Sequence, residues 1–330
     1  MKRTTSLVIL ALALGGAAAA QPAAPPQMPV FPPQTPEEKA ASDAHQAAYA
    51  KMPDTQGTGA YPAMKEMDPG LPDHVVYRPS DLAKVGKGQL GLVGWGNGAC
   101  SNDGAGQRLY LAEIASHGYV VVAPGGIHSG PGSIPLPPRP PGQTFTMATS
   151  AADVKAGIEW ALAENARPAS PYYGKIDPAK LAVAGFSCGG AQVLELAGDP
   201  RVKTVIMQNS GMFPDGVTVI PGLKVNKATL NTLHTPVLYI LGGPKDIAYN
   251  NGMDDFTRID HVPVAVVSNN ANHGGDFLKP NGGPSAKAAV AWLEWQLRDD
   301  KTARAYFVGK DCGICSDTQW TVQRKNLPTQ

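Results

Sequence analysis

The most restrictive feature of the sequence is a strand, a tight turn and a helix that follow one another within residues 181–196, LAVAGFSCGGAQVLEL. The apolar run before the turn predicts a buried strand, and the apolar residues after it predict a helix. The turn has the pattern Gly-x-Ser-x-Gly, in which Gly185 and Gly189 leave room for the chain to reverse around Ser187. The alternative is a glycine-rich turn that contains a serine by chance.

The other apolar runs alternate between strand and helix patterns. Strands are predicted at 75–79, where regular structure should begin, and at 89–95, 119–124, 203–208, 236–241 and finally 262–267. Helices are predicted at 108–118, after Ser150, and at 285–297, and Ser150 and Asp153 fit a capping box. This order predicts an α/β fold in which a mostly parallel central sheet carries helices on both faces. Residues 69–330 are expected to form this single domain.

Residues 1–68 differ in composition from the rest of the chain. Residues 1–20 combine Lys2 and Arg3 with a short apolar run and small residues, which predicts an export signal; an uncleaved membrane anchor is the alternative. Residues 21–68 are rich in Pro and Ala and are interpreted as a lead outside the core, with a short helix near 36–50. The mature protein is therefore expected to be periplasmic or secreted, without stable membrane insertion.

The charge of the chain is nearly balanced. It has 330 residues, of which 28 are basic and 27 acidic, so the formal net charge is +1. Such a chain has no overall electrostatic attraction to nucleic acid or to an anionic membrane. Nucleic acid is therefore not an expected partner.

The position of Ser187 suggests a chemical role. A serine becomes a good nucleophile when an imidazole takes its proton and a carboxylate orients that imidazole. Asp246 and His273 each follow a predicted strand, and the carboxyl ends of parallel strands meet at one edge of a sheet. We therefore expect Ser187, Asp246 and His273 to form a catalytic triad. Rival acids are Asp254 and Asp255, and rival bases are His45, His74, His117, His128, His234 and His261.

A triad of this kind also needs amide donors for the oxyanion of its tetrahedral intermediate. The backbone N–H of Cys188, directly after the serine, is one expected donor. The other is expected from the loop after the strand at 89–95, where Asn97 is the preferred residue and a neighbour the alternative. Trp95 and Gly96 beside this loop are expected to contact the substrate, and the Pro-rich loop 125–144 is expected to form a wall of the cleft.

Four cysteines in an exported chain are consistent with two disulfides, for which three connectivities are possible. The predicted fold brings Cys100 and Cys188 to one edge of the sheet, where a bridge would hold the oxyanion loop in place. Cys312 and Cys315 then remain as a local pair. A redox C-x-x-C motif or half of a zinc site is less favoured, because no thioredoxin-like unit and no second pair of ligands is visible. No metal site is predicted.

Four segments resemble secreted members of the α/β-hydrolase superfamily, most closely its dienelactone-hydrolase-like, chlorophyllase-like and polyester-hydrolase-like branch. They are YLAEIASHGYVVVAPG (110–125), GFSCGG (185–190), LGGPKDIAYNNGMDD (241–255) and FVGKDCGICSDTQWTVQRK (307–325). The chain departs from that branch at Cys188, where many polyester hydrolases carry Met, and in its 95–97 segment. Its predicted nucleophile is also a serine, whereas true dienelactone hydrolases use a cysteine.

The resemblance implies the α/β-hydrolase fold and a serine carboxylic ester hydrolase that requires no cofactor. The substrate would be a small-molecule or polymeric ester, such as a short acyl ester, a feruloyl ester or a polyester. Two alternatives remain: an acyltransferase or peptidase that uses the same triad, and a non-catalytic binding protein with this fold.

Overall fold

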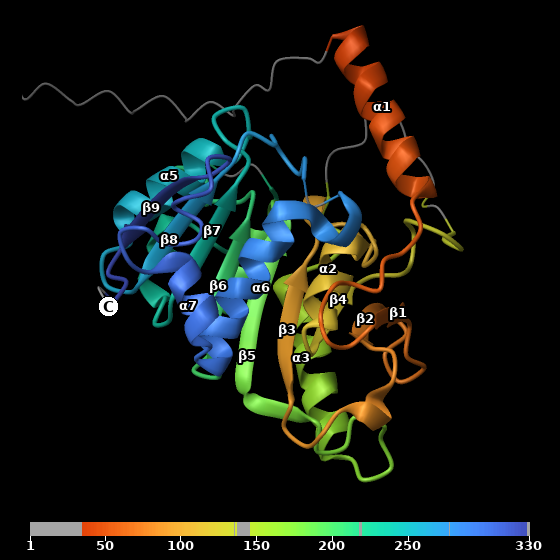
Figure 1. The fold of residues 1–330 in the computed structure, drawn as a ribbon. Coiled ribbons are helices and arrows are strands. Elements are labelled where there is room, and N and C mark those ends of the chain that lie inside the picture. The colour runs from red at the N-terminus through yellow and green to blue at the C-terminus, as the bar shows by residue number, and fades with distance from the viewer. Residues whose placement is uncertain (1–34, 135, 137–145, 218–219, 277, 329–330) are drawn as a thin grey trace, which may run out of the picture.

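The computed structural model describes residues 35–134, 136, 146–217, 220–276 and 278–328. The predicted export signal and the first part of the Pro-rich lead lie outside these residues, as do positions 135 and 137–145 of the long loop. Figure 1 shows a twisted sheet with helices packed against it.

The strands of the described residues form one nine-stranded sheet (Figure 1). They are β1 (Ala63–Glu66), β2 (His74–Pro79), β3 (Leu90–Gly96), β4 (Tyr119–Pro124), β5 (Ile176–Phe186), β6 (Val202–Gln208), β7 (Val237–Leu241), β8 (Val264–Ser268) and β9 (Thr321–Lys325). Their spatial order is β1-β2-β4-β3-β5-β6-β7-β8-β9. From β4 across to β8 neighbouring strands pair in parallel, whereas β1, β2 and β9 pair antiparallel.

Helices cover both faces of the sheet. The α-helices of the described residues are α1 (Pro36–Lys51), α2 (Arg108–Ser116), α3 (Ala151–Ala166), α4 (Cys188–Leu194), α5 (Tyr249–Arg258), α6 (Gly283–Arg298) and α7 (Lys301–Phe307). In β3, Val93 packs in one core with α2 and α6, and Leu92 packs in the opposite core with α3 and α4. Because both faces of the parallel strands are buried, these strands are continuous apolar runs in the sequence. The predicted α/β fold is therefore confirmed.

Two local predictions about helices are also confirmed. The helix expected near 36–50 is α1, which projects away from the sheet in Figure 1. At the start of α3, the Ser150 N–H donates a hydrogen bond of 2.7 Å to Asp153 Oδ2 in the expected capping box.

The predictions about the two ends of the sheet are wrong. Regular structure does not begin at residue 75, because β1 lies within the 21–68 lead and pairs with β2. The strand at 262–267 is not the last one, because β9 follows it and pairs antiparallel with β8. Both missed strands lie at sheet edges and read AMKE and TVQRK, so they lack the apolar run that marks a strand buried on two faces.

Part of the lead also packs against the domain. Tyr49 at the end of α1 is buried, and its hydroxyl donates a hydrogen bond to the Gly106 carbonyl at 3.0 Å. The guanidinium of Arg108 donates in return to the Tyr49 carbonyl at 2.7 Å. The end of α1 is thereby attached to the start of α2.

Candidate active site

Ser187 lies on the turn between β5 and α4, with a left-handed φ of +52°. This conformation is uncommon for a residue with a side chain, and close packing of the backbone around the turn maintains it. A Cβ added to Gly185 would lie 2.3 Å from the Gly189 carbonyl oxygen, and one added to Gly189 would lie 2.1 Å from the Gly96 backbone. The glycines thus allow the start of α4 to lie against β3 and β5, which is the strand-turn-helix arrangement predicted from the sequence.

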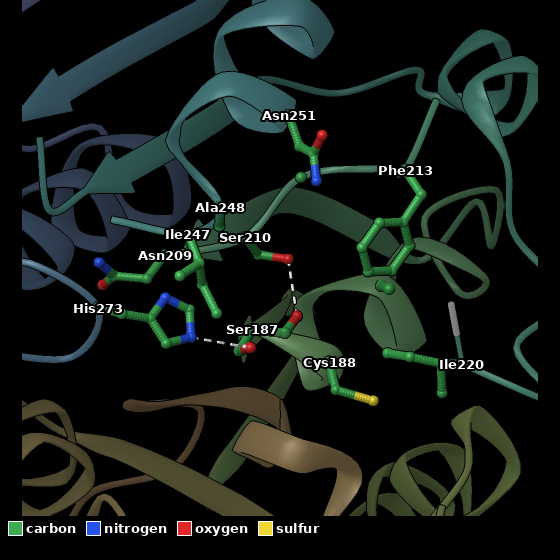
Figure 2. Close-up of a pocket in the computed structure, with 12 residues that line it drawn as sticks. Ser187, Cys188, Asn209, Ser210, Phe213, Ile220, Ile247, Ala248, Asn251 and His273 are labelled. Carbon is green, nitrogen blue, oxygen red and sulfur yellow. Dashed lines mark hydrogen bonds between the residues drawn. The ribbon is translucent and has the colours of Figure 1, made fainter. Parts of the chain in front are cut away.

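His273 joins Ser187 to Asp246. The imidazole Nε2 lies 3.1 Å from Ser187 Oγ, and Nδ1 lies 2.6 Å from Asp246 Oδ1. The three residues follow β5, β7 and β8, whose carboxyl ends lie on the same side of the sheet. Figure 2 shows the imidazole pointing at the serine hydroxyl. The structure therefore brings together the three residues that the sequence nominated.

The Asp246 carboxylate is buried among hydrogen-bond donors. Besides His273, these include the N–H groups of Gly242 at 3.0 Å and Ala248 at 2.9 Å. Burial raises the pKa of Asp246, but the hydrogen bond and charge of His273, together with the two N–H donors, outweigh burial and lower the pKa below its ordinary value. Asp246 is thus held in its ionised form.

Asn209 is a further partner of Asp246, and sequence reasoning did not identify it. Its amide Nδ2 donates to Asp246 Oδ2 at 2.7 Å and to the Asn272 carbonyl at 3.1 Å. Asn209 directly follows β6 and has a left-handed φ of +43°, which Asn tolerates better than most residues. In the sequence, the only sign of this role is the position of Asn209 at the end of a predicted strand, next to Ser210 and Gly211.

The loop after β3 borders Ser187 through Gly98 and Ala99, which line a cleft together with Ser187 and His273. Asn97 is completely buried, and its Nδ2 donates to the carbonyls of Ser101 at 3.0 Å and Pro124 at 2.6 Å. These contacts make Asn97 an anchor of the loop. They engage its side chain and not its backbone N–H, so the choice of Asn97 or a neighbour as oxyanion donor stays a prediction.

Trp95 and Gly96, which were expected to contact substrate, lie elsewhere. Trp95 is fully buried, and its ring centroid is 5.4 Å from that of Tyr110 in the core beneath α2. Gly96 faces the turn between β5 and α4, because a Cβ placed on it would lie 2.3 Å from the Gly189 carbonyl oxygen. The alternation of side chains along β3 turns Trp95 into the core, and proximity in sequence did not reveal this.

Two disulfides connect the four cysteines. Cys100 pairs with Cys188 across 88 residues, with a Cα–Cα distance of 5.3 Å, and Cys312 pairs with Cys315. The first bridge joins the loop after β3 to the residue after Ser187. Ala99 and Cys100 both have left-handed φ values, of +53° and +44°. The predicted pairing is confirmed, and it fixes a strained loop to the start of α4.

Two unequal spaces meet at Ser187. The smaller, here called the recess, has a volume of about 60 Å³ and is lined by Ala191, Ser210, Phe213, Ile220 and Asn251. The larger, here called the outer cleft, has a volume of about 570 Å³ and is lined by Ala99, Asp103, Gln107, Ser129, Phe186 and Leu278. Ser187, His273 and Ile247 border both spaces. In the view of Figure 2, Phe213 and His273 lie on opposite sides of Ser187.

Most of the rival residues have partners away from Ser187. Asp255 is buried next to Lys227, at 2.7 Å, and Asp254 forms a second ion pair with the same ammonium. His74 Nε2 lies 2.8 Å from the Asp153 carbonyl, and His117, the C-cap of α2, pairs with Glu113. His128 and His261 face the backbone carbonyls of Ile134 and Leu233.

Three further findings concern metal binding, membrane-spanning helices and similarity to known proteins. No group of three or more His, Cys, Asp or Glu side chains in the described ranges is placed to hold a metal ion. No helix among the described residues is both long and apolar enough to span a membrane. The chain matches no protein-family model, and no curated protein is significantly similar to it.

Proposed function

We propose that the protein is a serine carboxylic ester hydrolase that acts through an acyl-enzyme, as its resemblance to the α/β-hydrolase superfamily implies. The observation that supports this most strongly is the hydrogen-bonded series from Ser187 Oγ through His273 to Asp246. These atoms have the contacts that a nucleophile, its base and the residue that orients the base require.

Acylation begins when Ser187 Oγ attacks the ester carbonyl carbon and its proton moves to His273 Nε2. Asp246, ionised and bonded to Nδ1, stabilises the imidazolium that forms. The tetrahedral intermediate then collapses: the bond to the alcohol oxygen breaks, and His273 gives its proton to that oxygen. A water molecule, activated by the same imidazole, next attacks the acyl-enzyme and releases the acid.

The negatively charged oxygen of the tetrahedral intermediate needs hydrogen-bond donors close to it. In the proposed mechanism one donor is the backbone N–H of Cys188, and the second comes from the loop after β3, from Asn97 or from its neighbours Gly98 and Ala99 at the border of the outer cleft. The Cys100–Cys188 disulfide connects the two segments that would supply these donors. It would therefore keep the donors at a constant separation during the reaction.

We place the protein outside the reducing cytosol, in the periplasm or the medium, because its four cysteines form two disulfides. The export signal proposed at 1–20 would bring it there. The proposed chemistry uses side chains, backbone N–H groups and water, and calls for neither a metal nor an organic cofactor.

The test is a comparison of Ser187→Ala with wild type. We expect the variant to lose hydrolysis of p-nitrophenyl acetate and covalent labelling by a fluorophosphonate, because both require the Ser187 hydroxyl. Ser80→Ala removes an exposed serine at the end of β2 and serves as the matched control, which should behave as wild type. Labelling that persists in Ser187→Ala would overturn the assignment. Product analysis with alcohol and peptide acceptors separates hydrolysis from acyl transfer and peptide cleavage.

A further inference from the structure

The two spaces at Ser187 differ about tenfold in volume, about 60 Å³ for the recess against about 570 Å³ for the outer cleft. A water-sized group needs about 10–15 Å³ of such space, so the recess holds about four to six non-hydrogen atoms. The outer cleft lies in the range of about 300–1,000 Å³ that is typical of sites for drug-sized ligands. The ester that best fills both spaces at Ser187 therefore has one small and one large substituent.

The walls of the recess restrict what can enter it. Ala191, Phe213 and Ile220 give it a largely apolar lining, with the Asn251 amide and the Ser210 hydroxyl as polar groups. The Ser210 hydroxyl is engaged, since it donates to the Ser187 carbonyl at 2.8 Å (Figure 2). This lining suits a short aliphatic chain, and a longer one would meet the Phe213 ring.

The order of events in the reaction indicates which substituent enters which space. The acyl group stays bonded to Ser187 through two steps, whereas the alcohol must leave and be replaced by water. The outer cleft is the larger space and has Asp103, Gln107 and Ser129 along its wall, which are groups that bind water and alcohol hydroxyls. The recess therefore suits the acyl chain, and the outer cleft suits the alcohol.

The outer cleft also carries a negative charge. The Asp103 carboxylate accepts hydrogen bonds from the N–H groups of Ala105 at 3.0 Å and His128 at 3.1 Å, and from the Ser129 hydroxyl. These bonds hold the carboxylate in place at the wall. A substrate with an anionic alcohol would bring a like charge next to it, which disfavours binding.

We propose that the site takes esters of short-chain acids, of about two to four carbons, with bulky alcohols that carry no negative charge. The inference rests on the proposed ester hydrolysis and deepens it by naming the substrate class. Phe213 and Ile220 set the upper limit of acyl length, and Asp103 selects against anionic alcohols.

The first experiment measures kcat/KM of the wild-type protein on p-nitrophenyl acetate, butyrate and octanoate. Because each methylene that does not fit a pocket changes the rate about 10-fold or more, octanoate should fall at least about 100-fold below butyrate. In Phe213→Ala the octanoate-to-butyrate ratio should rise at least about tenfold, because the recess lengthens. In Ile220→Trp the butyrate-to-acetate ratio should fall about tenfold, because the recess is filled. Leu278→Ala, in the outer cleft, is the matched control and should leave both ratios unchanged.

The second experiment compares phenyl acetate with 4-acetoxybenzoate, each corrected for its rate of alkaline hydrolysis. Wild type should prefer the neutral ester about tenfold, and the near-isosteric Asp103→Asn should reduce this preference to about threefold or less, with the difference fading at high salt.

The outcomes separate this inference from the proposed function. If wild type hydrolyses octanoate as fast as butyrate while a fluorophosphonate still labels Ser187, the short-acyl assignment is wrong and ester hydrolysis stands. An unchanged preference in Asp103→Asn removes the assigned role of that carboxylate. Absence of both labelling and hydrolysis in the folded protein refutes the proposed function and this inference together.

Discussion

Asn209 Nδ2 lies 2.7 Å from Asp246 Oδ2, on the opposite carboxylate oxygen from the one that contacts His273. The carboxylate is thus held from two sides, by an imidazole and by an amide. Because the amide belongs to the residue after β6 and the carboxylate to the loop after β7, the contact ties together two neighbouring strand ends.

We predict that Asn209→Gly lowers kcat on p-nitrophenyl acetate by about 10- to 100-fold with little change in KM, since a hydrogen bond to a charged group contributes about 1.5–3 kcal/mol. Glycine is chosen because it retains the left-handed backbone without strain. Asn209→Ala adds that strain and should be less stable in urea than the glycine variant. A wild-type kcat in Asn209→Gly would show that Asp246 does not need the amide.

The two disulfides should differ in their effect on stability. In the chain-entropy model, a bridge that closes 88 residues stabilises the fold by about 4–5 kcal/mol, and one that closes three residues by about 1–2 kcal/mol. We expect Cys100→Ala/Cys188→Ala to unfold at much lower urea concentration and to lose kcat. Cys312→Ala/Cys315→Ala should lose little of either. Equal losses in the two double variants would contradict a special role for the Cys100–Cys188 bridge.

Lys227 allows a matched test of a buried and a partly exposed partner of one buried ammonium. Its ammonium is 2.7 Å from both Asp254, whose side chain is partly exposed, and Asp255, which is fully buried and also accepts the Met212 N–H at 2.8 Å. Asp255→Ala leaves the buried Lys227 ammonium without its buried carboxylate partner and should cost about 3–5 kcal/mol of unfolding free energy. Asp254→Ala should cost less than about 1 kcal/mol. Urea titrations of the two variants measure the difference, and equal costs would refute this account.

Asp255 should also make stability depend on pH. Burial raises its pKa from the ordinary 3.8 to about 6, against the opposing influence of Lys227. Between these two values the folded protein keeps a proton that the unfolded chain has lost, so the free energy of unfolding falls as pH rises through this window and levels off above about pH 6. Wild type should therefore lose stability relative to Asp255→Asn between about pH 4 and about pH 7. Identical pH profiles would contradict the raised pKa.

The sequence predicted the central strands and the convergence of Ser187, Asp246 and His273, because strands buried on both faces are apolar throughout and their ends meet at one edge. It failed at β1 and β9, where the edge strands carry polar residues. It also assigned substrate contact to Trp95, which the alternation along β3 turns into the core.

Contacts between side chains from distant segments were less accessible to sequence reasoning. The amide of Asn209 reaches Asp246 across two strand ends, and the Asn97 side chain is taken up by the carbonyls of Ser101 and Pro124. Neither residue lies in a sequence pattern that distinguishes a residue that holds the site in place from one that reacts with the substrate. The Cys100–Cys188 pair could be predicted because the parallel topology alone brings the two loops together.

The most direct test of the central claim is to trap the acyl-enzyme. Wild-type protein is mixed with p-nitrophenyl acetate, quenched in acid within the first turnover and digested, and the peptides are mapped by mass spectrometry. We predict one acetyl group on the peptide that contains Ser187, located on Ser187 itself, and none in Ser187→Ala. Acetylation of a different residue, or hydrolysis by wild type with no acetylated peptide at any quench time, would contradict the account.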